Sequence, residues 1–280
     1  MNVSIVIPVY NEADRLPACL DAIMAQTVQP LEVIVVDNNS SDETVAVAER
    51  YPMVRVIREA RQGVVYARDS GFDAARGEII GRLDADSVIA PDWVATVQQI
   101  FSESDVAAVS GRVRYYDLAY SQLLDWFDLR IRRRMARLLG REVALQGANM
   151  AVRASAWRTV RQSVCRRAGL HEDYDIAIHL QQAGWVNRFD ERLVAAIDCR
   201  RVEASLPEFF SYVWLSPKTY ALHRLKSRFH MYPVVTLVLL CYLPLKMLHK
   251  GYDVQAARFS WRQLFIEPPI ARVNPATFVD

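Results

Sequence analysis

The chain has 280 residues, of which 52% are hydrophobic and 24% charged, so it can bury a sizeable core and is not a disordered protein. Lys and Arg number 34 against 32 Asp and Glu, and this net charge of +2 excludes a protein devoted to neutralising nucleic-acid phosphates. Four cysteines lie far apart without a C-x-x-C pair, which argues against a disulfide scaffold or a Cys-ligated zinc site and favours a reducing compartment.

The first hundred residues alternate short apolar runs with segments of helical spacing. The N-terminus enters the first run directly, without the basic region or cleavage site of a signal peptide, so we expect a cytoplasmic protein. The predicted strands are Val3–Val9, Glu32–Val36, Val54–Ile57, Glu78–Leu83 and Val106–Ser110. The predicted helices are Leu16–Gln26, one that begins at Ser41 as N-cap, Val64–Ala75, and one from Pro91 to Phe101. This rhythm predicts an α/β fold with a doubly wound, mostly parallel sheet and helices on both faces.

After Gly111 the pattern becomes less regular. Leu123–Leu139 has an apolar stripe of helical spacing, formed by Phe127, Ile131, Met135 and Leu138, with several arginines on its other faces. Val143–Val152 is predicted to be extended, Asp173–Ala183 to be helical, and Leu193–Ile197 to be a late strand. We divide the chain into a main domain of residues 1–205, with halves 1–110 and 111–205, and a helical extension of residues 206–280.

Short polar side chains follow three of the predicted strands at their carboxyl ends. Asn11 and Glu12 follow the first strand, Asp37 ends the second, and Asp84-Ala85-Asp86 ends the fourth. In open α/β sheets, ligands bind outside the carboxyl ends of the strands. No glycine-rich dinucleotide or P-loop motif follows the first strand, so phosphates must be held in another way.

Asp84 and Asp86 supply two carboxylates one residue apart, and hard oxygen ligands of this kind suit Mg²⁺ or Mn²⁺. A divalent ion would neutralise a diphosphate and make it a better leaving group. The simpler alternative is that the Asp-x-Asp segment only caps the following helix. Its place beside the other two polar strand ends favours the metal site.

Several motifs, taken together and in this order, resemble the family 2 glycosyltransferases of GT-A fold. They are Ser4-Ile5-Val6-Ile7-Pro8-Val9-Tyr10-Asn11-Glu12, Glu32 to Thr44, Ala67-Arg68-Asp69-Ser70-Gly71, Asp84-Ala85-Asp86, Gly147 to Arg153, and His171-Glu172-Asp173. The resemblance spans roughly residues 2–200. It implies an inverting transfer of sugar from a nucleotide-diphosphate donor, with UDP-sugars expected, to a saccharide or a lipid-linked saccharide.

The resemblance also implies a role for each matching residue. Asp37 would hydrogen-bond the nucleotide base, Arg68 would lie along the nucleotide or its phosphates, Asp84 would contact the ribose or donor sugar, and Asp86 would be the principal ligand of the metal. The donor-binding residues expected on this basis are Pro8, Val9, Tyr10, Glu12, Asp37, Arg68, Asp84, Ala85 and Asp86. Asp69 departs from the family pattern, where Asn is common.

Asp173 is the expected catalytic residue, because the Asp of the family's Glu-Asp motif acts as general base toward the acceptor hydroxyl. The acceptor side would be formed by Gly147, Ala148, Asn149 and Glu172. An alternative role for Glu172 and Asp173 is to favour a helix N-terminus through the helix dipole, and both roles are compatible. The histidines at 171, 179, 223 and 230 are more simply read as structural residues than as metal ligands.

Two competing functions are weighed beside this one. A catalytically inactive nucleotide-sugar-binding protein would keep the fold but not the turnover. A nucleotidyltransferase would also bind nucleotide and metal, but it is expected to carry a glycine-rich, basic loop after the first strand, and Pro8–Glu12 is neither.

The apolar segment Met231–Leu245 raises the question of a membrane. As a helix it would be about 22 Å long, shorter than the roughly 30 Å hydrocarbon core, and Pro233 and Pro244 are expected to break it. A peripheral, interfacial contact fits better, because Arg and Lys flank the segment and the arginine-rich helix offers further positive charge. Such a contact would place the protein at the inner face of the plasma membrane, near a lipid-linked acceptor.

Overall fold

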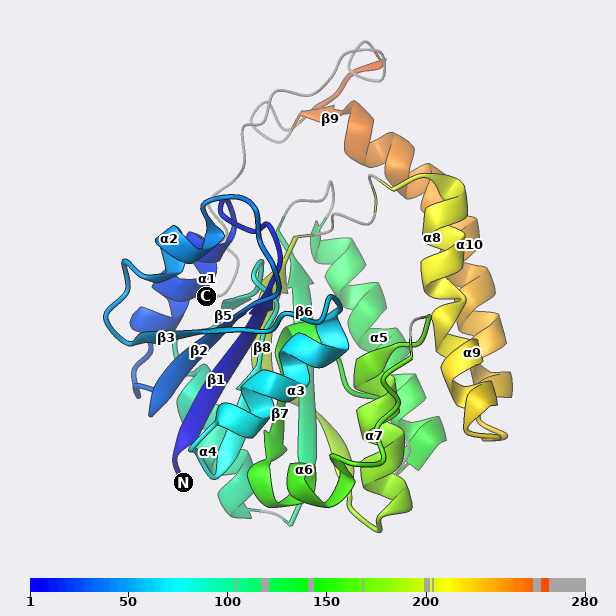
Figure 1. The fold of residues 1–280 in the computed structure, drawn as a ribbon. Coiled ribbons are helices and arrows are strands. Elements are labelled where there is room, and N and C mark those ends of the chain that lie inside the picture. The colour runs from blue at the N-terminus through cyan, green and yellow to red at the C-terminus, as the bar shows by residue number, and fades with distance from the viewer. Residues whose placement is uncertain are drawn as a thin grey trace.

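A computed structural model describes residues 1–103, 105–116, 121–140, 144–167, 169–198, 202, 204–253 and 258–261. Eight strands form one sheet: β1 (Val3–Val9), β2 (Glu32–Asp37), β3 (Val54–Arg58), β4 (Ile79–Arg82), β5 (Val88–Ile89), β6 (Ala108–Tyr115), β7 (Met150–Arg153) and β8 (Asn187–Ile197). They lie in the order β3-β2-β1-β4-β7-β6-β8-β5. The helices of the main body are α1 (Leu16–Met24), α2 (Thr44–Ala48), α3 (Val64–Ala74), α4 (Trp93–Glu103), α5 (Ser121–Leu139), α6 (Ala154–Val160) and α7 (Glu172–Gln182) (Figure 1).

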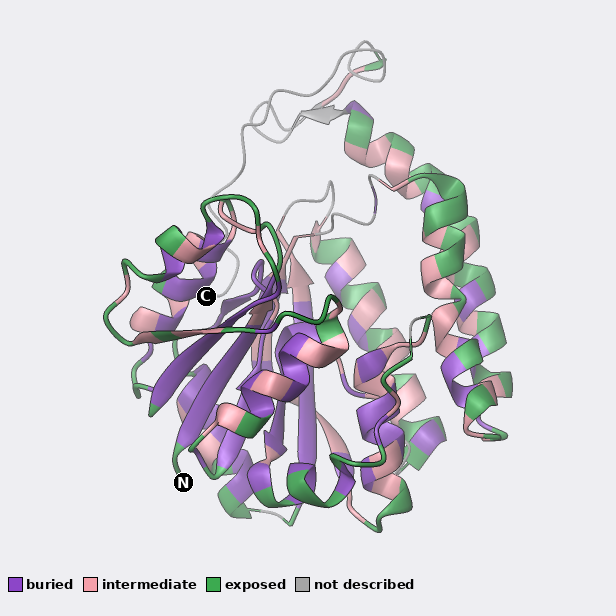
Figure 2. Ribbon diagram, viewed as in Figure 1, coloured by how far each residue is buried: buried purple, intermediate pink, exposed green. Residues whose placement is uncertain are grey.

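The first four strands are parallel, as the sequence predicts. Each is short and apolar, and alternate residues point to opposite faces of the sheet. Ile5 and Ile7 of β1 pack in one apolar core with residues of α1 and α4, whereas Val6 packs in a second core with residues of α3 and α6. Helices therefore cover both faces, and Figure 2 shows the central strands buried between them.

The second half of the sheet is mixed and not wholly parallel. β7 runs antiparallel to both β4 and β6, and β5 runs antiparallel to β8, while β6 and β8 are parallel. Residues 143–152, predicted as one extended segment, in fact contain a 3-10 turn at Gly147–Asn149 before β7 begins at Met150; residue 143 lies outside the described residues. The side chain of Asn149 makes hydrogen bonds in the protein interior, and these hydrogen bonds fix the turn.

Two helices differ from the sequence prediction in their contacts. Ser41 is not an N-cap: α2 begins at Thr44, and the side chain of Asp42 accepts the backbone N–H of Thr44 at 3.0 Å. In α5, Phe127 and Leu138 of the predicted apolar stripe are exposed, and the buried face carries Leu129, Leu139 and Asp125.

Three helices follow the main body: α8 (Leu206–Val213), α9 (Leu215–Leu222) and α10 (Arg228–Gly251). A two-residue pairing of β9 (Tyr252–Asp253) with β10 (Arg258–Phe259) comes after them. The prediction that the prolines break the apolar segment is wrong, because α10 is one 24-residue helix with Pro233 and Pro244 inside it. Within the described part of the chain, α10 alone is long and apolar enough to cross a membrane.

The helices α8 to α10 stand beside α5 and α7 on the side away from the sheet (Figure 1). A small apolar cluster joins them to the main body, with Leu139 from α5, Ile178 from α7, Tyr220 from α9 and Met231 from α10. The backbone N–H of His171 also donates to the hydroxyl of Thr219 in α9 at 3.0 Å. The extension is thus packed against the helix that the sequence assigns to catalysis.

Candidate active site

The loops that follow β1 and β2 are joined to each other by hydrogen bonds. Val9 and Asp37 are register partners in the sheet, so both strands end at the same edge. The backbone N–H of Asn11 donates to the hydroxyl of Ser40 at 3.1 Å, and the side-chain oxygen of Asn11 accepts the N–H of Ser41 at 2.8 Å. Asn11 has a φ of 54°, which Asn tolerates better than most residues. The two loops therefore form one continuous rim.

The expected donor-binding residues of this rim differ in exposure. Tyr10 is 52% exposed, whereas Val9 belongs to the core and Pro8 is half-buried. Asp37 is buried, and one of its carboxylate oxygens accepts the N–H of Ser40 at 3.0 Å. Glu12 is half-buried, with its backbone N–H donated to Thr44 and its carboxylate 3.7 Å from Arg15.

Asp84 and Asp86 lie in the turn that connects β4 to β5. The backbone N–H of Asp84 donates to the hydroxyl of Ser87 at 3.2 Å, and that hydroxyl donates to the carbonyl of Ala148 at 2.9 Å. Ala85, between them, is buried. The next helix, α4, begins only at Trp93, after β5, so the Asp-x-Asp segment does not cap a helix.

The two carboxylates fit a hard divalent cation. The side chain of Asp84 is 41% exposed, while Asp86 is buried. Burial raises the pKa of the Cys19 thiol, and the negative charges of Asp86 and Asp84 raise it further. The two side chains offer only oxygen ligands, and both come from one short turn at the strand end. Ligands of this kind suit Mg²⁺ or Mn²⁺.

Arg82 links this turn to α7. Its guanidinium is buried and lies 3.0 Å from the carboxylate of Asp84 and 2.8 Å from that of Glu172. Burial by itself would lower the pKa of Arg82, but the charges of Glu172, Asp84 and Asp173 raise it. A Cβ on Gly147 would lie 1.2 Å from Nη1 of Arg82, so a side chain at this position would displace the guanidinium.

Arg68 and Glu172, expected on the donor and the acceptor side respectively, are in contact with each other. Arg68 has no exposed surface, and its Nη1 donates to the carboxylate of Glu172 at 2.6 Å and to the carbonyl of Glu172 at 2.8 Å. Its remaining nitrogens bind Asp69. Burial would raise the pKa of Glu172, but the guanidiniums of Arg82 and Arg68 lower it below its usual value. Glu172 is therefore held as an anion behind the site.

Asp173 follows directly in the first turn of α7. One of its oxygens accepts the backbone N–H of Gly147 at 3.0 Å, and the other accepts the N–H of Tyr174 at 2.9 Å. Burial raises the pKa of Asp173, and the neighbouring charge of Glu172 raises it further. A carboxylate with a raised pKa is a stronger base than an ordinary aspartate.

The other residues expected on the acceptor side are buried. Asn149 has no exposed surface: its side-chain oxygen accepts the indole N–H of Trp93 at 2.8 Å, and its NH₂ donates to the carbonyls of Arg112 and Leu193. Ala148 is buried as well. These contacts set the turn that brings the N–H of Gly147 to Asp173, so Asn149 positions the site from within the core.

Three residues of the site were not predicted as functional: Arg82, His171 and Tyr212. The ring of His171 lies 4.9 Å from that of Tyr212 in α8, and its Nδ1 is 4.0 Å from Asp173. A charged residue inside the apolar run Ile79–Leu83 is a sequence signal that could have identified Arg82. Tyr212 carries no local signal, because it reaches the site only through the packing of α8.

Comparisons with known proteins identify the family of the chain. A family model described as glycosyl transferase family 2 matches residues 4–166, more than half of the chain. An uncharacterized glycosyltransferase, YibD of Escherichia coli, is 33% identical over 107 residues, which is 37% of this chain and 31% of YibD. The glycosyltransferase GlyG of Streptococcus pneumoniae is 32% identical over 120 residues, 41% of this chain and 40% of GlyG. The chain thus spans less than half the length of these curated relatives.

Solved structures share the fold at low sequence identity. The mannosyltransferase PcManGT from Pyrobaculum calidifontis, in complex with GDP-Man and Mn²⁺, superposes with a TM-score of 0.66 and 21% identity, covering 95% of this chain and 78% of that one. Residues 1–349 of TarS from S. aureus give a TM-score of 0.56 at 14% identity, covering 79% of this chain and 65% of that one. The predicted fold class, with its mixed α/β sheet and helical C-terminal part, is confirmed.

Proposed function

The chain belongs to glycosyl transferase family 2, and on that premise we propose that it transfers a sugar, with inversion, from a nucleotide-diphosphate donor to a hydroxyl group. The acceptor is a saccharide or a lipid-linked saccharide. Asp173 is the general base, and Asp84 and Asp86 are the donor-side carboxylates. The proposed donor-binding residues are those of the β1 and β2 rim together with the turn after β4.

The observation that carries this proposal is the buried contact of Arg82 with both halves of the site. A single guanidinium binds Asp84 at the donor side and Glu172 next to the proposed base. The glycine that leaves room for Arg82 also donates its backbone N–H to Asp173. The turn with Asp84 and the carboxylate of Asp173 are therefore held by the same few atoms, which supports the proposal because a direct displacement between two bound substrates requires fixed positions.

The chemistry assigned to the chain's own residues is simple. Asp173 accepts the proton of the acceptor hydroxyl while the acceptor oxygen forms a bond to the anomeric carbon. The bond from that carbon to the diphosphate oxygen breaks on the opposite face, and the nucleoside diphosphate leaves with the electron pair. Asp86, with Asp84, would hold Mg²⁺ or Mn²⁺, which supplies positive charge to the leaving diphosphate. Arg68 acts indirectly in this scheme, by holding Glu172.

Nucleotide-sugar binding is the experiment that tests the proposal. Calorimetric titrations with UDP-, GDP- and dTDP-sugars, each with Mn²⁺ and then with EDTA, identify the donor; the expected donor is UDP-linked, and the GDP-Man bound to PcManGT makes GDP-sugars the main comparison. We expect metal-dependent binding of one class that is lost in Asp86→Ala. Binding without turnover for any acceptor would favour an inactive nucleotide-sugar-binding protein. No binding in the presence of metal would contradict the proposal.

We further propose that the outer face of α8 and α10 rests on an anionic membrane surface. The exposed apolar residues of α10 recur at helical spacing: Phe229, Tyr232, Leu237, Leu240, Leu243 and Met247. Leu206, Phe210 and Trp214 extend this face on α8, and Figure 2 shows how little of these helices is buried. Basic residues at both ends of α10 suit anionic headgroups. This position would bring a lipid-linked acceptor to the enzyme.

A further inference from the structure

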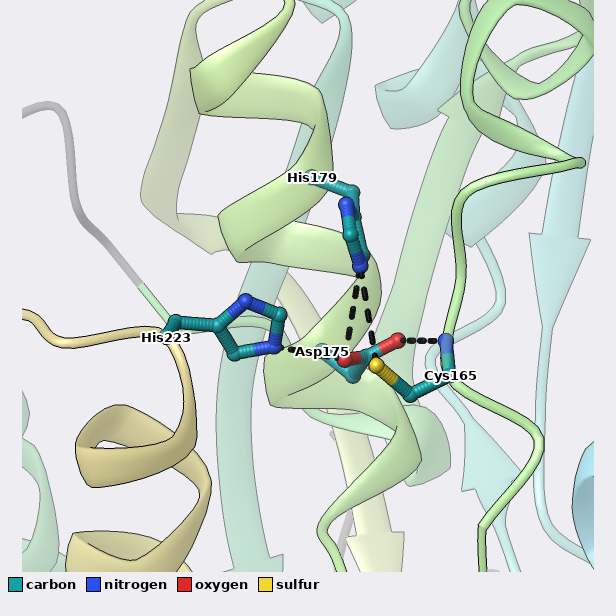
Figure 3. A group of neighbouring side chains, drawn as sticks. All are labelled: Cys165, Asp175, His179 and His223. Carbon is teal, nitrogen blue, oxygen red and sulfur yellow. Dashed lines mark hydrogen bonds and ion pairs between the residues drawn. The ribbon is translucent and has the colours of Figure 1, made fainter.

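Four side chains with metal-ligating atoms meet where α7, α9 and the segment after α6 come together. They are Cys165, Asp175, His179 and His223, and their ligand atoms all lie within 4.8 Å of one another. Figure 3 shows all four side chains pointing toward a common centre. Asp175 and His179 are one turn apart on α7, Cys165 comes from the segment after α6, and His223 is the C-cap residue of α9.

Two of the separations between these ligand atoms are close to those of a tetrahedral zinc site. Sγ of Cys165 lies 3.9 Å from Nε2 of His179, and that nitrogen lies 3.6 Å from Oδ1 of Asp175. With Zn–S bonds of about 2.3 Å and Zn–N or Zn–O bonds of about 2.0–2.1 Å, tetrahedral ligands are about 3.3–3.6 Å apart. Nε2 of His223 and Oδ1 of Asp175 are closer, at 2.7 Å, because they share a hydrogen bond. With the same bond lengths, metal binding would move these two atoms apart by about 0.6 Å.

The environment of the cluster also suits a bound cation. The Asp175 side chain is 1% exposed, that of His223 8% and that of His179 13%. The second oxygen of Asp175 accepts the backbone N–H of Cys165 at 2.7 Å, which orients the carboxylate toward the two histidines.

We infer that Cys165, Asp175, His179 and His223 bind a zinc ion that fastens the C-terminal helices to the catalytic helix α7. A ligand set of one sulfur, two imidazole nitrogens and one carboxylate oxygen suits zinc, whereas the oxygen-only set of Asp84 and Asp86 suits Mg²⁺ or Mn²⁺. Four protein ligands leave no open position, so the ion is structural. The absence of a C-x-x-C pair in the sequence argued against such a site; here the ligands come from three separate segments.

The zinc site would affect catalysis only by fixing the positions of the helices around the active site. Asp175 lies two residues after Asp173 in the same helix, and His223 is joined through α9 to α8, which carries Tyr212. An ion at this point therefore connects the first turn of α7 with the helices that complete the acceptor side. The inference does not depend on the donor or the reaction proposed above.

Metal content and a cobalt spectrum test the site directly. The full chain, purified without a histidine tag, is stripped with a chelator and reloaded with Zn²⁺ or Co²⁺. We expect one tightly held zinc per chain and, with cobalt, a near-ultraviolet thiolate-to-metal band with intense tetrahedral visible bands. Cys165→Ser should abolish the thiolate band, and His223→Ala should weaken zinc binding by at least about tenfold.

Two variants serve as matched controls, and a third separates the two metal sites. Cys241→Ser and His230→Ala remove an exposed cysteine and an exposed histidine of α10, and both should leave zinc binding unchanged. Asp86→Ala should retain the zinc while losing metal-dependent donor binding. A wild-type chain that binds no stoichiometric zinc, a cobalt spectrum without a thiolate band, or a thiolate band that persists in Cys165→Ser would each overturn the inference. If a variant fails to fold, the cobalt spectrum of the wild-type chain still decides whether a thiolate binds the metal.

Discussion

Glu172 and Asp173 are neighbours in the chain, yet their surroundings shift their pKa values in opposite directions. Glu172 lies between the guanidiniums of Arg68 and Arg82, which lower its pKa. Asp173 is half-buried beside that fixed negative charge, and desolvation and the charge of Glu172 raise its pKa more than the charges of His171 and Arg82 and its backbone hydrogen bonds lower it. One carboxylate is thus kept as an anion for structure, while the other is a better proton acceptor.

Asp173→Asn tests the assignment of the base. The amide cannot accept the proton of the acceptor hydroxyl, so we expect turnover to fall by at least about 100-fold while calorimetric donor binding stays at the wild-type level. Asp92→Asn, an exposed acidic residue before α4, is the control and should keep full turnover. A loss of less than tenfold, roughly 1.4 kcal/mol in the barrier, would show that Asp173 is not the base.

Gly147→Ala tests the space that Arg82 needs. The added Cβ would meet the guanidinium at 1.2 Å, so Arg82 must leave Asp84 or Glu172. We expect the free energy of unfolding to fall by about 1–3 kcal/mol, together with a clear loss of turnover. Gly140→Ala is a stringent control, because it carries backbone strain at a φ of +55° but its Cβ meets no atom within 4 Å. Equal stability and activity in Gly147→Ala would refute the steric argument.

At the scale of elements, β2 is held at its first residue by a buried ionic group. The carboxylate of Glu32 accepts hydrogen bonds from Ser4 of β1, from Arg55 of β3 and from Arg76, which follows α3. Burial by itself would raise the pKa of Glu32, but the hydrogen bonds from Arg76, Ser4 and Arg55 lower it to about 2. This one carboxylate therefore connects the three parallel strands at the edge of the sheet opposite the site.

The lowered pKa of Glu32 predicts acid sensitivity. A carboxyl whose pKa is lower in the folded state stabilises the fold above its unfolded value, 4.5, and this contribution is lost as the pH falls toward about 2. Glu32→Gln should reduce the free energy of unfolding at pH 7 by about 1–3 kcal/mol and flatten its dependence on pH between 4.5 and 2. Urea unfolding of both proteins at several pH values measures this. Parallel pH profiles would contradict the prediction.

The strands β1 to β4 and their helices could be predicted because each is a short apolar run with a local pattern. In the second half, α5, α7 and the end of β8 could also be predicted. The turn before β7 and the antiparallel pairing of β7 could not, because β7 is positioned by Asn149, whose partners Trp93, Arg112 and Leu193 are distant in the chain. The same holds for the site. Asp84, Asp86 and Asp173 stand in recognisable motifs, whereas the contact of Arg68 with Glu172 spans 104 positions and has no local signature.

At the scale of the whole molecule, exposed apolar side chains gather on α8 and α10, and basic residues lie at both ends of α10. Besides α8 and α10, helix α5 exposes Trp126 and Phe127, with the guanidinium of Arg130 5.2 Å from the Trp126 ring. Apolar rings next to positive charge are typical of helices that rest at a membrane surface.

Vesicle binding tests this surface. The full chain should sediment with vesicles that contain anionic lipid at low salt, and much less with neutral vesicles or at high salt, because headgroup attraction is screened. Leu240→Glu combined with Leu243→Glu should weaken binding by at least about tenfold, since two apolar contacts are lost and like charges are added. Leu31→Glu, at a residue of similar exposure before β2, is the control. A wild-type chain that stays wholly in the supernatant would contradict the proposal.

The two prolines inside α10 bear on how this helix can meet a lipid bilayer. Proline has no N–H, so the carbonyls four residues earlier, those of Phe229 and Leu240, lose their usual helical donor. Both residues are on the exposed face, at 58% and 71%. If α10 crossed the bilayer, the carbonyl of Leu240 in mid-helix would need a donor from a neighbouring helix, a side chain or an ordered water, whereas at the headgroup level bulk water can donate to both carbonyls. The backbone of α10 therefore favours a helix lying along the bilayer surface over one that crosses it.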